Sequence, residues 1–582
     1  MASDDLEKLF QGIFQRFWNW RLINAPEFAT SIGKHFYSDR LDEMSLSSYK
    51  RRENEANSFL LEIKDLRKNP IFDSLSDGLV LNVDLLQADL EQFTNGVQFQ
   101  TYLFPLNMLE GPQIDFPRLL TWMENKTVKN FKDIITRLRL FPQRTDEIIS
   151  LLDEGIRKGI TMHKVSISAL PKTFGDMGLV SPEESPHFKP FLKKSDGIPT
   201  KDWEQLVIDA KDVLKTKVLP SYIRLSEYIK NVYMENTRPE IAATSLPNGK
   251  CYYEGCLKFH TTTNMSAEEV FKKGKEEVKR ITENMEAVKA QVGFKGDLKE
   301  FRKYLRTDSQ FKFESKEHIL KHYKDIYSKI LAVLPQLFER LPEAKCEIVP
   351  VPEEVAPSFP GAYYLAPPED GSRPGTFYIN THNPTNRNTY EAVSLALHEA
   401  QPGHHLQGSL TMESSGLLSF RRFMEDRNYY EPPGRFAMNS AYVEGWGLYS
   451  EYLGEELKLY EDPYDLFGRL SHEMLRACRL VVDPGMHALG WSHQQAVDFL
   501  LENTASSEED IISEIDRYIT WPGQACGYKI GEIKIKELRS MAENELGNKF
   551  DIKKFHDLIA SVGGVPLDIL ENLIKNFISK YK

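Results

Sequence analysis

The stretch HEAQPGHHLQ, residues 398–407, combines residue types that can bind a metal ion and use it. Neutral imidazoles are zinc ligands, and a carboxylate beside them can accept a proton during hydrolysis. Glu399 follows His398 directly, and two further histidines, His404 and His405, close the stretch. This set of residues indicates zinc-dependent hydrolysis, with Glu399 as the general base.

The spacing of these histidines differs from the common H-E-x-x-H pattern, in which both lie on one helical face. Zinc bonds of about 2.0 to 2.1 Å keep two ligating nitrogens within roughly 4 Å of each other. In a straight helix, His404 and His405 would lie about 9 and about 10.5 Å beyond His398. Pro402 and Gly403 favour a broken turn that could return one of them to His398. The alternative is a helix that simply ends at Pro-Gly with polar residues around its end.

A third ligand is needed, and the segment RFAMNSAYVEGWGLYSEYL offers it. Zinc in peptidases commonly takes two histidines and one carboxylate. Glu444 stands between Val443 and Trp446, a setting unlike that of a solvated surface carboxylate. We therefore predict Glu444 as the third ligand. Glu451 lies seven residues further on the same helical face and is predicted to accept a hydrogen bond that orients a histidine.

The amino-acid composition argues against several classes of protein. The 582 residues are 41% hydrophobic and 27% charged, which is ordinary for a globular chain. A net charge of -12 argues against nucleic acid as the main partner. The start MASDDLEKLF is unlike a secretory signal, and no apolar run is long enough for a membrane span. Cysteines are few, and Cys251 and Cys256 are more typical of free thiols than of a metal pair, so we expect a cytoplasmic protein without a membrane partner.

Helical periodicity dominates the rest of the chain. We predict a mainly α fold of two lobes with an N-terminal helical region (1–170), a surface connection (171–200), a second helical region (201–345) and a catalytic region (346–582). The segment GKCYYEGCLKFHTTT could be strand or buried helix. The apolar stripes that carry the helical prediction are Phe10, Ile13, Phe14 and Phe17; Ile148, Leu151, Leu152 and Ile156; Phe271, Val278, Ile281, Met285 and Val288; and Ile319, Tyr323, Ile326, Ile330 and Leu334.

Two short β-type runs precede the histidine motif, Tyr363 to Ala366 and Thr376 to Thr381. A Pro/Gly/Asp turn region separates them, which predicts a hairpin, and the flanking prolines favour exposed edges. An edge strand beside a zinc helix can hold an extended peptide as an added strand. We therefore predict Phe377 and Tyr378 as substrate-binding residues, with a purely structural hairpin as the alternative.

Five segments in this order resemble the block signatures of the domain of unknown function 885 family: DGSRPGTFYINT, HEAQPGHHLQ, YVEGWGLYSE, RLVVDPGMHALGWS and PGQACGYKIG. That family is regarded as zinc-peptidase-like and similar in its core to the thimet oligopeptidase and carboxypeptidase Taq peptidases. The resemblance implies a large helical metallopeptidase-like fold of the gluzincin type, with a small sheet beside a deep cleft. It is strongest between residues 361 and 538.

The resemblance also assigns roles by position. His398 corresponds to the first zinc ligand of the oligopeptidases and Glu444 to the third. His404 matches their second histidine and is preferred to His405, which could instead position substrate. Three residues depart from the family pattern, namely Pro484, Gly447 and Gly527, and none removes a proposed ligand.

Stabilising the negative oxygen of the tetrahedral intermediate requires hydrogen-bond donors. Tyr528 and His487 are our candidates, since tyrosines and histidines fill this role in the similar oligopeptidases. Tyr528 could instead be a packed aromatic, and His487 a core histidine. Arg479 could hold a substrate carboxylate or form a structural ion pair.

The sequence thus predicts an enzyme with one Zn²⁺ that cleaves peptide bonds of short peptides, as an oligopeptidase or a carboxypeptidase-like enzyme. One alternative keeps the same site for a small non-peptide amide conjugate. Another is a catalytically silent helical scaffold that binds a peptide, although a scaffold would not need His398, Glu399 and Glu444.

Overall fold

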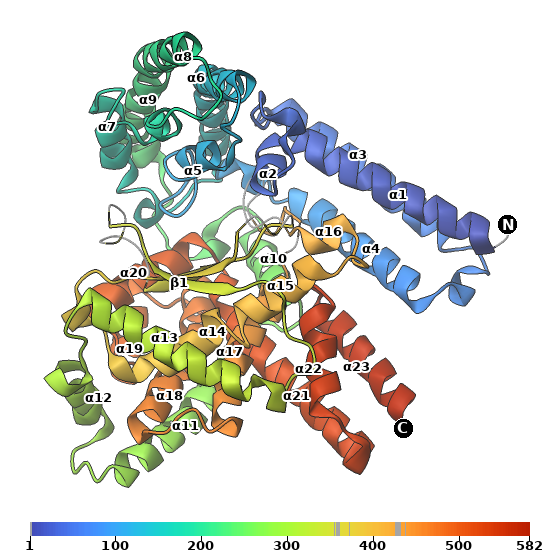
Figure 1. Cartoon of the computed structure of the whole chain (residues 1–582), viewed down its shortest axis with the longest axis vertical. Coiled ribbons are helices and arrows are strands. Elements are labelled where there is room, and N and C mark those ends of the chain that lie inside the picture. The colour runs from blue at the N-terminus through green and yellow to red at the C-terminus, as the bar shows by residue number, and fades with distance from the viewer. Residues whose placement is uncertain are drawn as a thin grey trace. The chain divides into compact units, whose positions relative to one another are not determined.

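The structure is a computed structural model that describes residues 3–353, 356, 361–369, 371, 373–424, 432–436 and 438–582. Most of these residues are helical (Figure 1), which confirms the predicted mainly α class. The chain forms two compact units, residues 1–255 with 425–437, and residues 256–424 with 438–582. In the described ranges, no helix is both long and apolar enough to cross a bilayer.

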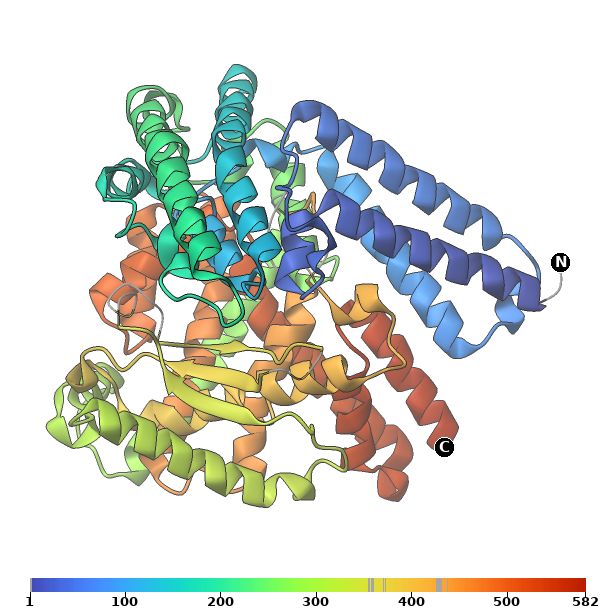
Figure 2. The same ribbon diagram turned by 45° about the horizontal axis from the view of Figure 1, so that its top comes forward.

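The first unit is built from helices only, as far as the structure describes it. The predicted stripe Phe10, Ile13, Phe14 and Phe17 is buried in its first helix. The helices α1, α3 and α4 lie side by side in Figures 1 and 2. The helices of this unit are α1 (Ser3–Asn24), α2 (Pro26–Ser31), α3 (Leu46–Leu66), α4 (Asp77–Val97), α5 (Asp115–Trp122), α6 (Val128–Lys158), α7 (Leu170–Leu179), α8 (Thr200–Val213) and α9 (Leu219–Asn231).

Residues 171–200 correct one prediction, because they are not a surface connection. They hold most of α7 and the short helix Pro186–Phe191, and their phenylalanines Phe174, Phe188 and Phe191 are buried. Pro171 and Pro186 stand in the first turns of these helices, where proline is tolerated because its missing N–H has no helical partner. The predicted boundaries near 200 and 345 also differ from the observed division, since α8 and α9 pack against α6.

The segment GKCYYEGCLKFHTTT, left open between strand and helix, forms α10 (Gly249–Thr261). The second unit then contains the remaining helices and the sheet. They are α11 (Ala267–Gln291), α12 (Leu298–Thr307), α13 (Lys316–Val333), β1 (Cys346–Pro350), β2 (Ala362–Leu365), β3 (Gly375–Ile379), α14 (Ala392–Glu399), α15 (His404–Glu413), α16 (Ser419–Arg422), α17 (Ser440–Glu456), α18 (Pro463–His487), α19 (His493–Asn503), α20 (Glu508–Thr520), α21 (Gly527–Leu546), α22 (Ile552–Ser561) and α23 (Leu567–Tyr581).

The sheet has the strand order β1-β3-β2, with β1 parallel and β2 antiparallel to β3. The predicted hairpin is therefore present as β2 and β3, although residues 370 and 372 of its turn lie outside the described ranges. Its second strand is central rather than an edge, because β1 pairs with its other side. Pro374 does not prevent this, since it precedes the first paired residue, Gly375.

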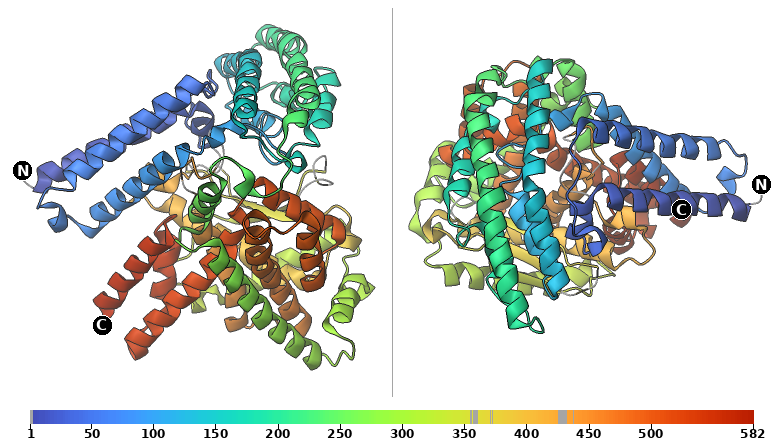
Figure 3. Two further views of the ribbon diagram at one scale, coloured as in Figure 1. Left: turned by 180° about the vertical axis from the view of Figure 1, so that it is seen from behind. Right: turned by 90° about the horizontal axis from the view of Figure 1, so that it is seen from above.

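Long helices of the second unit support the region around residues 398–407. Helix α11 packs along α18 (Figure 3), and α17 packs along α21. Helix α14 contacts α13, α17 and α18, while α15 contacts β2, β3 and α17. Helix α13 runs beside the sheet in Figure 2. The HEAQPGHH segment is thus held between a small sheet and a layer of long helices.

Candidate metal centre

A break in the helix brings two distant histidines together. Helix α14 ends at Glu399 and α15 begins at His404, and the peptide bond between Gln401 and Pro402 is cis. A Cβ atom at Gly403 would lie 1.9 Å from the carbonyl oxygen of His398, so only glycine fits there. The imidazole rings of His398 and His404 end up 4.7 Å apart between centroids and almost perpendicular, at 89°.

The indole of Trp446 fixes this turn from the neighbouring helix. Trp446 is fully buried, and its Nε1–H donates to the carbonyl oxygen of Pro402 at 2.8 Å. It lies on α17, two residues after Glu444. The turn and the third predicted ligand are therefore positioned by the same helix.

His398, His404 and Glu444 form the group of potential metal ligands that the described part of the chain contains. One ligand atom from each lies within 4.8 Å of the others. The Nε2 atoms of both histidines are 3.5 Å from Oε2 of Glu444. Ligands at zinc bond lengths in a tetrahedral arrangement are separated by about 3.3 Å. The donor set and its spacing therefore fit one Zn²⁺, with a position left for water.

His405 is directed elsewhere. Its Nε2–H donates to the carbonyl oxygen of Ala344 at 3.0 Å, and its Nδ1 lies 2.9 Å from the hydroxyl of Tyr364 on β2. Burial lowers the pKa of His405 to about 4. With both ring nitrogens engaged, His405 links α15 to the sheet and is not part of the ligand group.

Behind these three residues, Glu451 forms a hydrogen bond to the first histidine. Its Oε1 accepts a hydrogen bond from Nδ1 of His398 at 2.8 Å, which leaves Nε2 of His398 facing Glu444. The other oxygen of Glu451 lies 3.6 Å from Nδ1 of His472, and that nitrogen is also 2.8 Å from the hydroxyl of Ser394. A chain of polar contacts thus runs from His398 to α18.

The electrostatics of the group favour charged carboxylates. Burial raises the pKa of Glu444, but hydrogen bonds and charge from His398 and His404 outweigh this and hold it well below its usual range. For Glu451, burial is likewise outweighed by His398, His472 and the charge of Arg476, so its pKa is also lowered. Burial lowers the pKa of His398, yet hydrogen bonds to Glu444 and Glu451 raise it to about 9. The negatively charged carboxylates of Glu444 and Glu451 therefore favour a positive charge beside them.

Gly447 also belongs to this geometry. A Cβ atom there would lie 2.8 Å from the ring of His398. This glycine, one of the three departures from the family pattern, therefore leaves room for that imidazole in its present orientation.

The predicted catalytic residues are placed as follows. Glu399 is the last residue of α14, is partly exposed, and its charge contributes to the raised pKa of His398. Tyr528, near the start of α21, has its pKa raised by burial and by the charge of Glu444, so it lies near that ligand. His487 is fully buried and its Nε2 donates to the carbonyl oxygen of Tyr518 at 3.0 Å, which fits the core alternative.

Of the three predicted substrate-binding residues, one is buried, one is partly exposed and one forms an ion pair. Phe377 is fully buried against Tyr323 of α13, so it is a core residue and the prediction is corrected: its side chain packs on helix α13. Tyr378 is partly exposed and stacks on Tyr363 of β2, with ring centroids 4.5 Å apart. Arg479 pairs with Glu514 at 2.9 Å, which fits the structural alternative.

Sequence reasoning missed His472 and Arg476. Together with Arg479 they occupy one face of α18, at spacings of four and three residues, and that face is directed to Glu451 and Tyr528. The available signal was the helical spacing of these three basic residues in α18.

Comparison with known proteins places this geometry in a family. Residues 26–574 match the family described as "Bacterial protein of unknown function (DUF885)". The chain belongs to this family. None of the curated proteins matches it.

Two solved structures share the fold. One, from Colwellia psychrerythraea, is 28% identical, and the match covers 100% of both chains with a TM-score of 0.90. The other, from Shewanella oneidensis, is 16% identical, with 97% of this chain and 99% of that chain covered and a TM-score of 0.73. Both are described as a "putative lipoprotein", the second of unknown function.

Proposed function

We propose that the chain is a zinc-dependent hydrolase that cleaves peptide bonds of short peptides. The observation that carries the proposal is the convergence of His398, His404 and Glu444, with Glu399 directly after the first ligand. A bound Zn²⁺ would lower the pKa of water and polarise a carbonyl group. Two histidines and one carboxylate form the ligand set that zinc peptidases commonly use.

Two residues of the chain would carry out proton transfer and stabilise the negative oxygen. Glu399 would accept a proton from the attacking water and return it to the leaving amine. Tyr528 would donate a hydrogen bond to the oxygen that becomes negative. The electrostatic interaction of its hydroxyl with Glu444 supports this role, because it implies a position near the candidate metal centre.

Strand β2 supports a peptide as the substrate. In the described part of the sheet, β2 pairs with β3 on one side only, and it contacts both α14 and α15. The backbone groups on its outer side can pair with an extended chain, as in other edge-strand complexes. Such pairing would place the backbone of a peptide beside the candidate metal centre, whatever side chains the peptide carries.

The test combines metal content and turnover. The purified protein is expected to hold zinc by elemental analysis and to cleave a mixed peptide library, as read by mass spectrometry. Cleavage should stop with a chelator and in Glu399→Gln, which removes the base but no ligand. A metal-loaded protein that cleaves a small amide conjugate and no peptide would support the non-peptide alternative instead. Binding without any cleavage would support the scaffold.

We also propose a cytoplasmic location, although the two similar structures carry a lipoprotein description of their own. Fractionation of cells that express the native gene, with membrane and soluble markers, tests this. Recovery in the membrane fraction would refute it.

A further inference from the structure

Arg476 occupies the middle of the polar face of α18. One turn before it, His472 contacts Glu451, and three residues after it, Arg479 stacks under Tyr528 with its guanidinium carbon 4.6 Å from the ring centroid. The guanidinium carbon of Arg476 is 6.0 Å from the same ring. Its positive charge also reaches Glu451. Arg476 therefore lies between the residue that orients His398 and the residue proposed to stabilise the transition state.

Unlike its neighbours, Arg476 forms no ion pair with any residue that the structure describes. Arg479 and Arg517 both pair with Glu514 at 2.9 Å, and Arg469 pairs with Glu455 at 2.7 Å. Across the described ranges, no carboxylate lies within ion-pair distance of Arg476. Its Nη1 donates to the carbonyl oxygen of His472, in its own helix, at 3.3 Å. Its Nε is buried and lacks a partner among the described residues.

A half-buried guanidinium in this state is unusual, because removing a charge from water is unfavourable unless an opposite charge compensates it. Two of its nitrogens could still donate in parallel to a planar anion, the geometry in which arginine binds carboxylates best. The arrangement next to a candidate hydrolytic centre therefore points to an anionic group on the substrate. A peptide carries one such group whatever its sequence, the carboxylate at its C-terminus.

We propose that Arg476 binds the C-terminal carboxylate of the peptide substrate, so that the enzyme removes residues from the carboxyl end. The inference rests on the proposed function and narrows its substrate class. In the reaction, the oxygen of water adds to the carbonyl carbon and the C–N bond breaks. The leaving amine takes a proton, and the products are a shortened peptide with a new carboxylate and the released C-terminal residue.

Matched peptides test this directly. Two short peptides share one sequence and an acetylated N-terminus, and they end either in a free acid or in an amide. The expected kcat/KM is about 10- to 100-fold higher for the acid, the range of a charged hydrogen bond. A third peptide, amidated but ending in glutamate, separates a terminal carboxylate from one on a side chain, and it should behave like the amide.

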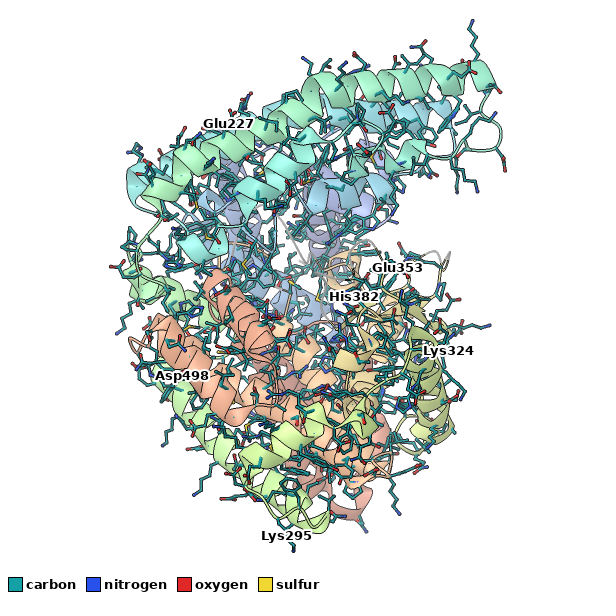
Figure 4. The ribbon with its side chains drawn as sticks, turned by 90° about the vertical axis from the view of Figure 1, so that its left-hand side faces the viewer. Glu227, Lys295, Lys324, Glu353, His382 and Asp498 are labelled. Atoms are coloured by element: carbon teal, nitrogen blue, oxygen red, sulfur yellow. The ribbon has the colours of Figure 1, made fainter. Side chains whose placement is uncertain are left out.

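Variants of Arg476 test whether this residue causes the preference for the free acid. In Arg476→Gln, the acid and the amide should be cleaved at rates within about 2-fold, mainly through a higher KM for the acid. Arg476→Lys keeps the charge without the planar fork and should restore part of the preference. Lys324→Gln is the control, because it removes a positive charge from the outer surface of α13 (Figure 4) and should leave the preference intact.

A binding measurement provides a readout that does not depend on turnover. Calorimetry with Glu399→Gln, with zinc and after chelation, compares the acid with the amide. The acid should bind about 10- to 100-fold more tightly, and adding Arg476→Gln should abolish the difference. Equal affinity of acid and amide would overturn the inference.

The turnover results separate two kinds of failure. Chelator-sensitive cleavage that is equally fast for acid and amide would overturn the inference and leave the hydrolase intact. A zinc-loaded protein that cleaves no peptide would overturn the proposed function and the inference with it.

Discussion

At the scale of single residues, the site depends on which ring nitrogen faces which partner. Glu451 holds Nδ1 of His398, so Nε2 is left to face Glu444. His405, adjacent to His404, has no ring nitrogen left for this group, because Ala344 and Tyr364 contact both of its nitrogens. His404 and His405 are therefore suited to different roles, because their ring nitrogens have different partners.

His404→Ala and His405→Ala form a matched pair that tests this assignment. We expect His404→Ala to lose tight zinc binding, since it removes a ligand, while its thermal stability without metal changes little. His405→Ala should keep the zinc and lower the melting temperature, because it leaves buried partners unsatisfied. Elemental analysis and calorimetry in the presence of a chelator measure both effects. Retention of zinc by His404→Ala would exclude it as a ligand.

Glu451→Gln tests the orienting contact. The amide keeps the size of the side chain but weakens the hydrogen bond to His398, and we expect about 10- to 100-fold lower zinc affinity. Competition with a chromophoric chelator measures this. The control is Glu456→Gln, on the same helix but paired with Arg539, which should bind zinc normally. An unchanged affinity in Glu451→Gln would show that packing alone orients the imidazole.

At the scale of elements, buried charges fix the helices behind the site. The ammonium group of Lys529, next to Tyr528 on α21, lies 2.6 Å from Glu473 on α18 and 3.1 Å from Glu277 on α11, and it also pairs with Glu532. Lys529 and Glu473 are each 1% exposed. This cluster joins three helices and determines where α21 begins, which in turn positions Tyr528.

Lys529→Met should destabilise the second unit strongly. Removing Lys529 takes one buried cation from Glu473 and Glu532, which keep Arg469 and Lys536 as partners, so the loss should be at most about 3 to 5 kcal/mol. Urea unfolding followed by circular dichroism gives the change. Lys534→Met, whose partner Glu571 is more exposed, is the control and should change stability by about 1 kcal/mol or less. Similar losses in both variants would contradict a special role for the cluster.

At the scale of the whole molecule, buried histidines make the fold sensitive to acid. His187 in the first unit and His556 in the second are almost fully buried, and burial lowers the pKa of each to about 3. Their hydrogen-bond partners include the hydroxyls of Tyr222 and Tyr449. Both rings are therefore neutral in the folded state at neutral pH.

The free energy of unfolding should fall as the pH drops from about 6.5 towards 3. In that window the unfolded chain binds a proton at each histidine and the folded chain does not, so each lowers stability by up to about 1.4 kcal/mol per pH unit. Urea unfolding at several pH values measures the slope. His556→Gln should make it shallower by one proton, whereas a variant of the partly exposed His318 should not. An unchanged slope would place the sensitivity elsewhere.

The sequence by itself determined the chemistry available to this protein. Residue types at 398, 399, 404 and 444 predicted a set for zinc hydrolysis, and helical periodicity predicted the mainly α class, which depends on short-range spacing. The stripe in α11 was likewise local, and of its residues Val278, Ile281, Met285 and Val288 are buried and Phe271 is partly exposed.

Tertiary structure decided what local spacing could not. Strand β1 pairs with β3 across about 30 residues, which made β3 central, and Phe377 is buried against Tyr323 of α13. The choice between His404 and His405 depended on Ala344 and Tyr364, both more than 40 residues away. Arg476 became notable only because no carboxylate of the described residues lies within ion-pair distance of it. Such contacts are set by packing between elements, and a single sequence does not specify them residue by residue.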